Sequence, residues 1–337
     1  MRILFCTHVF APSVGGIETV SAMLAEEFVR QGHEVELVTQ TAGDAMRGEG
    51  YRIHRRPGLR QLLRLLRWCE VCFHNNISLR TAWPLLLLPR PWVVAHHTWI
   101  PHAGLAGRVK RLALRRARGI APSRALAGHL DTPVTVIPNP YDEGRFGPRE
   151  GVRRERDMVF VGRLVSDKGC GQLLDALQIL FARGLHPTLT IIGSGPEAGT
   201  LAEQASRLGL AARVEFTGVL HGENLVAALN RHRILVVPSR WEEPFGVVAL
   251  EGVACGCVVV GSDGGGLPDA MGPCGLAYER GNAQALADSL ERMLRDDSLR
   301  ARLRDAAPGH LATHHRPAVA ARYLRVLGEA AGGRRGG

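Results

Sequence analysis

Apolar residues in the first part of the chain alternate between two patterns. Residues 2–7 form an almost uninterrupted apolar run, which is typical of a strand buried on both faces of a parallel sheet. From Ile17 to Phe28 the apolar residues recur every three or four positions, which predicts an amphipathic helix. Residues 35–39 again resemble a buried strand. This order of strand, helix and strand favours a parallel sheet with helices on both faces. Further short strands are expected at 71–74, 92–96 and 135–137.

The second half of the chain repeats this alternation. A helix is expected over 171–183, and strands are expected at 158–161, 188–192, 214–217, 235–237 and 258–260. Between the halves, 137–144 is rich in residues that favour turns, so we place a hinge near it. The predicted fold class is α/β, with two doubly wound, Rossmann-like domains that face each other across a cleft. The expected segments are an N-terminal domain over 1–140, the hinge over 141–150, a C-terminal domain over 151–312, a helix over 313–329 that packs back on the first domain, and a frayed tail over 330–337.

Composition agrees with a globular protein and excludes several other classes. The 337 residues are too many for one compact core and suit two domains. Apolar residues make up 45% and charged residues 22%, which excludes a mainly disordered chain. The longest leucine run, Leu85–Leu88, is far shorter than the roughly 20 apolar residues of a membrane span. No signal peptide is recognisable, because the apolar run at 2–7 reads as a strand. We therefore expect a cytoplasmic protein.

The seven cysteines cannot all pair, and their spacing is typical of buried thiols. Two residues separate Cys69 from Cys72, and one residue separates Cys255 from Cys257. Neither pair has the further Cys or His residues nearby in sequence that a four-ligand zinc site needs. Free cysteine is often simply buried, so we expect structural thiols in a reducing compartment and no metal site.

Positive charge is concentrated in one part of the first half. The chain carries a net charge of +10, and 52–118 holds 14 basic side chains against one acid, Glu70. Two amphipathic helices with solvated arginine faces are the favoured interpretation, because charged outer faces are common. Docking on an anionic inner membrane leaflet is the alternative. Aromatic residues make up only 5%, too few for base-stacking platforms, so nucleic acid is not an expected partner. The arginines concerned are Arg60, Arg64 and Arg67 on one predicted helix, and Arg108, Arg111, Arg115 and Arg118 on another.

A loop with two cations follows the predicted strand at 158–161. It contains Arg163 and Lys168, and the chain has only two lysines in all. A guanidinium can bind two phosphate oxygens at once and an ammonium acts as a compact point charge, so the loop suits a diphosphate. An ordinary solvated basic loop is the alternative.

The segment 238–251 combines a predicted helix start with two carboxylates. Pro244 suits the first turn of a helix, so the free backbone N–H groups after it are expected to form an anion site. Glu251 would lie two helical turns beyond Glu243, among small residues that permit close packing. Because an unpaired buried charge is costly, such carboxylates are expected to accept hydroxyl groups, one from each sugar ring of a nucleotide sugar. The backbone groups concerned are those of Phe245, Gly246, Val247 and Val248.

Two glycine-rich loops follow strands in the second half, at 193–198 and 264–266. The first, Gly193–Ala198, matches G-x-G-x-x-A, and Glu215 follows about 20 residues later, as in a weak dinucleotide fingerprint. A tight turn that lets a strand and a helix pack closely explains these glycines equally well. An NAD-dependent oxidoreductase that uses Gly193–Ala198 is therefore an alternative function, and a non-catalytic basic protein that binds membrane or nucleic acid is another.

Candidate site residues of the first half lie after predicted strands. Gly16 stands at the predicted N-terminus of a helix, where glycine lets backbone amides approach an anion; a plain turn is the alternative. His96 and His97 end a predicted strand and would project at the sheet edge. A histidine pair there favours acid–base or hydroxyl-binding chemistry.

With these motifs the chain resembles glycosyltransferase family 4, a family of retaining enzymes with the GT-B fold. The resemblance covers nearly the whole length and is most specific in 238–265, which is similar to the family's E-x7-E motif and its flanks. The family usually has an acidic residue after its strand-end histidine and P-E in its late glycine loop. This chain has Thr98 and Pro268-Asp269 at those places. The resemblance implies that Glu243 meets the donor sugar, Glu251 the ribose, Arg163 and Lys168 the diphosphate and Gly16 the phosphates, with His97 as the acceptor-domain histidine and His96 as the alternative.

The reaction implied by the resemblance is transfer of a sugar from a nucleotide diphosphate sugar to a hydroxyl acceptor, with retention. His97 and Glu243 would be the catalytic residues. No D-x-D triplet occurs, so we expect a metal-independent reaction without a cofactor, in which Arg163, Lys168 and a helix N-terminus stabilise the diphosphate leaving group. The donor would be a UDP- or GDP-sugar, and the acceptor a lipid-linked molecule or a small natural product. The sequence alone identifies neither the nucleobase, nor the sugar, nor the acceptor, nor the oligomeric state.

Overall fold

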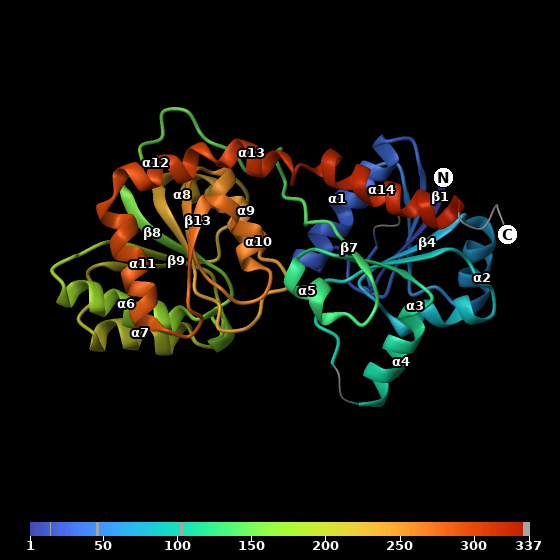
Figure 1. The fold of residues 1–337 in the computed structure, drawn as a ribbon, viewed down its shortest axis with the longest axis horizontal. Coiled ribbons are helices and arrows are strands. Elements are labelled where there is room, and N and C mark those ends of the chain that lie inside the picture. Colours follow the sequence, from blue (N-terminus) through green and yellow to red (C-terminus); the bar gives the residue numbers. More distant parts are fainter. Residues whose placement is uncertain (14, 45–46, 102–103, 333–337) are drawn as a thin grey trace. The chain divides into compact units, whose positions relative to one another are not determined.

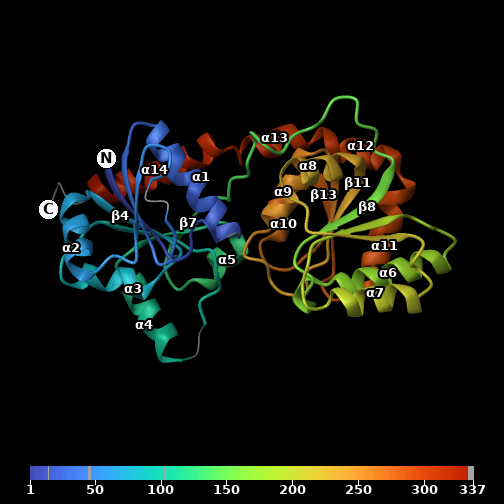
Figure 2. The same cartoon turned by 180° about the vertical axis from the view of Figure 1, so that it is seen from behind.

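The computed structural model describes residues 1–13, 15–44, 47–101 and 104–332, with the side chains of 105 and 106 left out. The chain divides into two compact units (Figures 1 and 2). The first unit contains Met1–Pro140 together with the C-terminal part from His314 onward, and the second contains Tyr141–Thr313.

The described part of the first unit contains a seven-stranded parallel sheet in the order β3-β2-β1-β4-β5-β6-β7. Because successive side chains of a strand point to opposite faces, β1 contributes Phe5 to one core and Cys6 to the other. Helices cover both faces, so both cores are closed. The strands are β1 (Arg2–Thr7), β2 (Glu34–Thr39), β3 (Arg52–Arg55), β4 (Val71–Asn75), β5 (Trp92–Ala95), β6 (Arg118–Ala121) and β7 (Val134–Val136).

Two helices far apart in sequence cover one face of this sheet. They are α1 (Gly16–Arg30) and α14 (Arg316–Gly332), which lie side by side in Figures 1 and 2. Tyr323 of α14 stacks edge-on against Phe73 of β4 with 5.8 Å between ring centroids. The opposite face is covered by α2 (Leu59–Trp68), α3 (Leu79–Ala82), the 3₁₀ helix η1 (Trp83–Leu86) and α4 (Leu105–Leu114), and α5 (Arg124–His129) precedes β7.

The second unit has a parallel sheet of six described strands in the order β10-β9-β8-β11-β12-β13. Its strands are β8 (Arg156–Val161), β9 (Leu189–Ile192), β10 (Val214–Gly218), β11 (His232–Val237), β12 (Val258–Ser262) and β13 (Gly275–Tyr278). Its helices are η2 (Ser166–Lys168), α6 (Cys170–Ala182), α7 (Ala198–Arg207), α8 (Gly222–Arg231), α9 (Val247–Ala254), α10 (Leu267–Met271), η3 (Gly272–Cys274), α11 (Ala283–Arg295), α12 (Asp297–Asp305) and α13 (Ala307–Ala312).

The predicted α/β class with two Rossmann-like parallel sheets is confirmed. Three local predictions are wrong. Residues 141–150 are not a separate hinge, because Tyr141 and Phe146 are buried in the core of the second unit. Arg118 belongs to strand β6 and not to a helix. The chain is not frayed from residue 330, because α14 continues to Gly332 and Ala330 packs against the core; the rest of the predicted tail, 333–337, lies outside the described residues.

No helix in the described part of the chain combines the length and the apolarity that a bilayer span requires.

Candidate functional site

Two candidate residues of the second unit lie in connections that leave the carboxyl ends of neighbouring strands. The loop after β8 carries Lys168, and the loop after β11 carries Glu243. Close backbone contacts join them. Gly169 has φ +72°, and a side chain there would come within 1.9 Å of the Pro238 carbonyl oxygen. The Arg240 N–H donates to the carbonyl oxygen of Asp167 at 2.8 Å. Only glycine at 169 permits this approach.

This approach brings a cation and a carboxylate into contact. The Lys168 ammonium donates to Glu243 Oε1 at 2.5 Å, and the Ser239 hydroxyl donates to the same oxygen at 2.8 Å. The two charged side chains are largely buried, with 22% and 12% of their surfaces exposed. The sequence predicted both residues as site residues, and the structure brings them together.

A third loop holds the backbone of Glu243. The Gly266 N–H donates to the Glu243 carbonyl oxygen at 2.7 Å. Gly265 has φ +64°, and a side chain there would come within 2.2 Å of that oxygen. The glycine loop after β12 therefore fixes the backbone position of Glu243. From the sequence, this loop was expected only as a glycine-rich loop after a strand.

The predicted helix start at Pro244 is wrong. Helix α9 begins at Val247, and Gly246 before it has φ +107°, outside the helical region. Phe245 is buried in the core, with 2% of its surface exposed. The N–H groups of Val247 and Val248 therefore belong to the first turn of α9, whereas those of Phe245 and Gly246 precede the helix. Glu243 is not on the same helix as Glu251.

Glu251 lies inside α9 and is partly buried. Burial raises the pKa of its carboxyl to about 7, with Arg145 opposing the shift and Asp142 adding to it. The small residue next to it has a packing role: a side chain at Gly252 would come within 2.4 Å of Leu235 in β11. The expectation that small residues let this helix pack closely is confirmed.

The loop 193–198 does not assemble a dinucleotide fingerprint. A side chain at Gly193 would come within 1.8 Å of the carbonyl oxygen of Gly162, and one at Gly195 within 2.2 Å of the carbonyl oxygen of Leu164. These glycines therefore pack against the loop that carries Arg163. Glu215 lies near the amino end of β10, whereas the glycines follow the carboxyl end of β9.

Glu215 also has another partner, since it forms an ion pair with Arg156 at 3.3 Å. The glycines are explained by loop packing. Arg163 itself is exposed, and the structure gives its guanidinium no partner within the described residues.

In the first unit, Gly16 begins α1, the first helix after β1, as predicted, and a side chain there would meet nothing within 4 Å. His96 and His97 follow β5 but do not project into solvent, because they are 1% and 7% exposed. Burial lowers the pKa of His96 to about 4 and that of His97 to about 3, the latter helped by the neighbouring His96. Both rings are therefore uncharged at neutral pH.

A chain of buried hydrogen bonds holds His97 and connects it to α1 and β1. The Thr7 hydroxyl donates to the carbonyl oxygen of Val9 at 2.9 Å, and the Ser21 hydroxyl donates to Thr7 Oγ1 at 3.3 Å. The Asn75 amide nitrogen donates to Ser21 Oγ at 2.7 Å, and Asn75 Oδ1 lies 2.7 Å from His97 Nε2. Because the amide nitrogen of Asn75 donates to Ser21, its Oδ1 faces His97 and can only accept, so His97 Nε2 must carry the hydrogen. Nδ1 keeps the lone pair of the ring.

Sequence reasoning missed Thr7, Ser21 and Asn75. Thr7 and Asn75 end the strands β1 and β4, and a polar residue at the carboxyl end of a buried strand was the available signal. Ser21 lies within the apolar stripe of α1, where its hydroxyl looks like an exception to the pattern. The role of this hydroxyl becomes clear only once its partners Thr7 on β1 and Asn75 on β4 are placed.

Two family models match the chain, one in each unit. The model described as "Glycosyltransferase Family 4" matches residues 14–145, and the model described as "Glycosyl transferases group 1" matches residues 148–310. Among curated proteins, the chain is similar to glycogen synthase of Mycobacterium tuberculosis, with 36% identity over 180 residues, 52% of this chain and 43% of that protein. It is also similar to 2-deoxystreptamine glucosyltransferase of Streptomyces kanamyceticus, with 30% identity over 253 residues, 67% of this chain and 65% of that protein. The chain thus spans about half the length of the curated relatives it matches.

Solved structures share the fold over nearly the whole chain. HepE of Anabaena in complex with UDP has a TM-score of 0.80 and 21% identity, covering 98% of this chain and 100% of that one. Sucrose-phosphate synthase of Thermosynechococcus elongatus has a TM-score of 0.77 and 21% identity, covering 97% of this chain and 99% of that one. At this identity the likeness shows the fold alone.

Proposed function

Since the chain belongs to glycosyltransferase family 4, with the two Rossmann-like domains of the GT-B fold, we propose that it transfers a sugar from a nucleotide diphosphate sugar to a hydroxyl acceptor, with retention at the anomeric carbon. The contact between Lys168 and Glu243 carries this proposal. A cation suited to a diphosphate and a carboxylate suited to a sugar hydroxyl meet at one point. In a nucleotide diphosphate sugar, the bond that a glycosyltransferase breaks joins the diphosphate to the sugar.

The leaving diphosphate would be stabilised by positive groups of the second unit. Lys168 and the exposed Arg163 supply two cations, and the first N–H groups of α9, at Val247 and Val248, supply the positive end of a helix dipole. Since these groups offset the charge, the proposed reaction needs no metal ion. On donor binding, the diphosphate oxygens would replace Glu243 as the partner of Lys168 and leave the carboxylate for the sugar.

Retention follows from a front-face displacement. The acceptor oxygen forms a bond with the anomeric carbon while the bond from that carbon to the phosphate oxygen breaks. The proton of the acceptor hydroxyl passes to the leaving phosphate, so no covalent sugar–enzyme intermediate is needed. Glu251 would accept the ribose hydroxyls, and the N-terminus of α1 at Gly16 would approach the phosphates. His97, uncharged and held by Asn75, would hydrogen-bond a hydroxyl group as a catalytic residue rather than supply a positive charge.

A ligand panel tests the donor. We expect the melting temperature to rise with one nucleoside diphosphate among UDP, GDP, ADP and TDP, and not with NAD or NADP. A ligand at 100 times its Kd adds about 2.7 kcal/mol to the free energy of unfolding, or several degrees at this size. UDP and GDP are the first candidates, because HepE was solved with UDP and UDP-glucose and another relative is named as GDP-mannose-dependent.

The lysines provide a matched pair of variants for that panel. Lys168→Ala should abolish the shift, whereas Lys110→Ala, which removes the other lysine of the chain, should keep it. Glu243→Ala should retain the nucleoside diphosphate shift but lose sugar transfer, because its carboxylate is assigned to the sugar. A full shift in Lys168→Ala, or shifts with NAD and NADP alone, would contradict the proposal.

One observation favours membrane docking of the first unit over a plain solvated face. Trp83, Leu86 and Leu87 are 42%, 65% and 63% exposed, and they lie between Arg80 and Arg90 in sequence. Exposed apolar side chains flanked by arginines suit an anionic bilayer surface. We propose that this face brings the protein to a lipid-linked acceptor. Sedimentation with acidic vesicles at low salt, lost at high salt, is the expected result, and no sedimentation at low salt would contradict it.

A further inference from the structure

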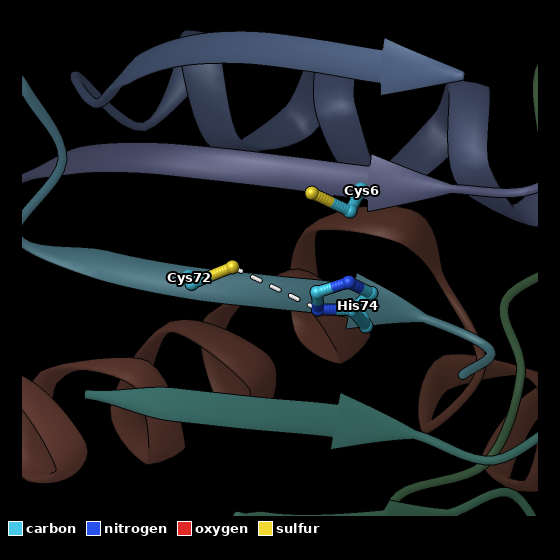
Figure 3. Close-up of side chains that lie close together, drawn as sticks. All are labelled: Cys6, Cys72 and His74. Carbon is cyan, nitrogen blue, oxygen red and sulfur yellow. Dashed lines mark hydrogen bonds between the residues drawn. The ribbon is translucent and has the colours of Figure 1, made fainter. Parts of the chain in front are cut away.

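Three side chains with metal-binding atoms meet on one face of the sheet of the first unit. Cys6 lies on β1, and Cys72 and His74 lie on the neighbouring β4 (Figure 3). In the strand register Cys6 faces His74 and Leu4 faces Cys72. Side chains two residues apart on a strand share a face, so all three point to the core beneath α2. Asn75, the next residue, points to the opposite face and accepts the hydrogen bond of His97.

The distances suit one small ion. The two Sγ atoms and one His74 ring nitrogen all lie within 4.8 Å of one another, and Cys72 Sγ is 3.7 Å from His74 Nδ1. A metal with bonds of about 2.0–2.3 Å to nitrogen and sulfur needs its ligands roughly 3.5–4.0 Å apart. Small side-chain rotations therefore suffice, and the strands need not move.

The hydrogen bonds of His74 fix the tautomer that a metal-bound histidine needs. Its Nε2 lies 3.1 Å from Thr81 Oγ1, and the Thr81 hydroxyl donates to the carbonyl oxygen of Ser78. That hydroxyl has one hydrogen, so Nε2 must carry the proton and Nδ1 must hold the lone pair. A partner that fixes the second ring nitrogen is the usual support of a histidine ligand. Nδ1 lies 3.7 Å from Cys72 Sγ, and its lone pair accepts the Trp92 indole N–H at 2.9 Å, which a bound ion would displace.

We propose that Cys6, Cys72 and His74 bind one thiophilic d10 metal ion, with Cu(I) as the best match. Two sulfurs and one imidazole are soft ligands, which select Cu(I) or Zn(II) over Mg(II) or Ca(II). The three side chains are at most 1% exposed, so the site is dry. Cu(I) accepts three ligands without water, whereas Zn(II) in proteins takes a fourth.

Binding would change the protein in definite ways. Each of the two thiols releases its proton to solvent, and the ion takes the Nδ1 lone pair from the Trp92 indole. The ion would also cross-link β1 to β4 near the centre of the sheet. We therefore expect proton release, a change in tryptophan fluorescence and a higher melting temperature together.

The test is a titration of the reduced chain with Cu(I) under anaerobic conditions. We expect one equivalent to bind with an ultraviolet thiolate-to-metal band, and X-ray absorption of the loaded protein to give two sulfurs and one nitrogen. Cys6→Ser and Cys72→Ser should each lose the band and the thermal shift. His74→Gln should weaken binding at least tenfold. Cys274→Ser, which removes a buried thiol of the second unit, should behave like the unchanged protein.

Several outcomes would overturn the proposal. They are the absence of a stoichiometric band, a band that survives the Cys6→Ser and Cys72→Ser changes, or equal loss of the band in Cys274→Ser. X-ray absorption that shows fewer than two sulfurs bound to the metal in the unchanged chain would overturn the proposal even if the variants fail to fold. In each case the three residues are a hydrogen-bonded part of the core. Sugar transfer plays no part in these readouts, so the proposed function stands or falls separately.

Discussion

Replacement of Gly265 by alanine should disable sugar transfer without touching any side chain assigned to the reaction. Gly265 has φ +64°, and a methyl group there would lie 2.2 Å from the carbonyl oxygen of Glu243 and 2.9 Å from its nitrogen. Both atoms are backbone, so a side-chain rotation cannot relieve the contact. The Glu243 segment must move away, and with it the carboxylate that pairs with Lys168.

The size of the effect follows from these contacts. A left-handed conformation costs alanine about 1–2 kcal/mol, and overpacking of this kind typically costs about 1–3 kcal/mol more. At about 2–4 °C per kcal/mol, the melting temperature should fall by roughly 4–20 °C. The methyl–oxygen distance must grow from 2.2 Å to at least 3.0 Å. A displacement of about 1 Å at a reacting group can lower the rate about 100-fold.

Gly184→Ala is the matched control. Gly184 has φ +77°, belongs to the same unit, and has nothing within 4 Å of an added methyl group. Gly184→Ala therefore has the cost of a left-handed alanine but not the close contact with the Glu243 backbone. Turnover with the donor found in the ligand panel and thermal melting should be measured for both variants. If Gly265→Ala has the same melting temperature as Gly184→Ala and keeps full turnover, the glycine loop does not position Glu243 and the reasoning fails.

Three further predictions concern the buried polar groups. Asn75→Ala leaves the buried His97 Nε2–H without its acceptor, at about 1–3 kcal/mol, and removes the N–H donor to Ser21 Oγ, whose own hydrogen bond to Thr7 stays. It should lower kcat about tenfold with little change in donor KM, and unchanged kcat would argue against the hydrogen-bond chain. Burial lowers the pKa of His97 to about 3, so an NMR titration from pH 8 to 5 should show no protonation of its ring, and a step near 6.5 would contradict this. Burial raises the pKa of Glu251 from 4.5 to about 7, so the folded state holds that proton more tightly than the unfolded chain. The stability that this proton contributes is complete below pH 4.5 and is lost as the pH rises through 7. The free energy of unfolding falls by at most about 1.4 kcal/mol per pH unit in that range. Glu251→Gln should lack this part of the pH dependence of the melting temperature.

The sequence alone determined the elements and the fold class. The apolar run at 2–7 predicted β1 with its observed bounds, and the stripe from Ile17 to Phe28 predicted α1. These signals are local, because a buried strand or an amphipathic helix must carry its apolar residues at fixed spacing wherever it packs. Glu243 and Lys168 could also be singled out from sequence, since their motifs are short and continuous.

Only the tertiary structure decided how these elements meet. Helix α9 begins at Val247 rather than at Pro244, because Gly246 takes a left-handed conformation beside Leu267, whose Cδ1 would lie 2.8 Å from an added methyl group. The dinucleotide-like glycines proved to be loop-packing residues once the loops after β8 and β9 were in place.

The Cys6–Cys72–His74 group and the chain from Thr7 to His97 likewise depend on β4 pairing with β1. Strand order is set by crossover connections that no local pattern encodes. Residues separated by tens of positions therefore become neighbours for a reason that only the assembled sheet supplies.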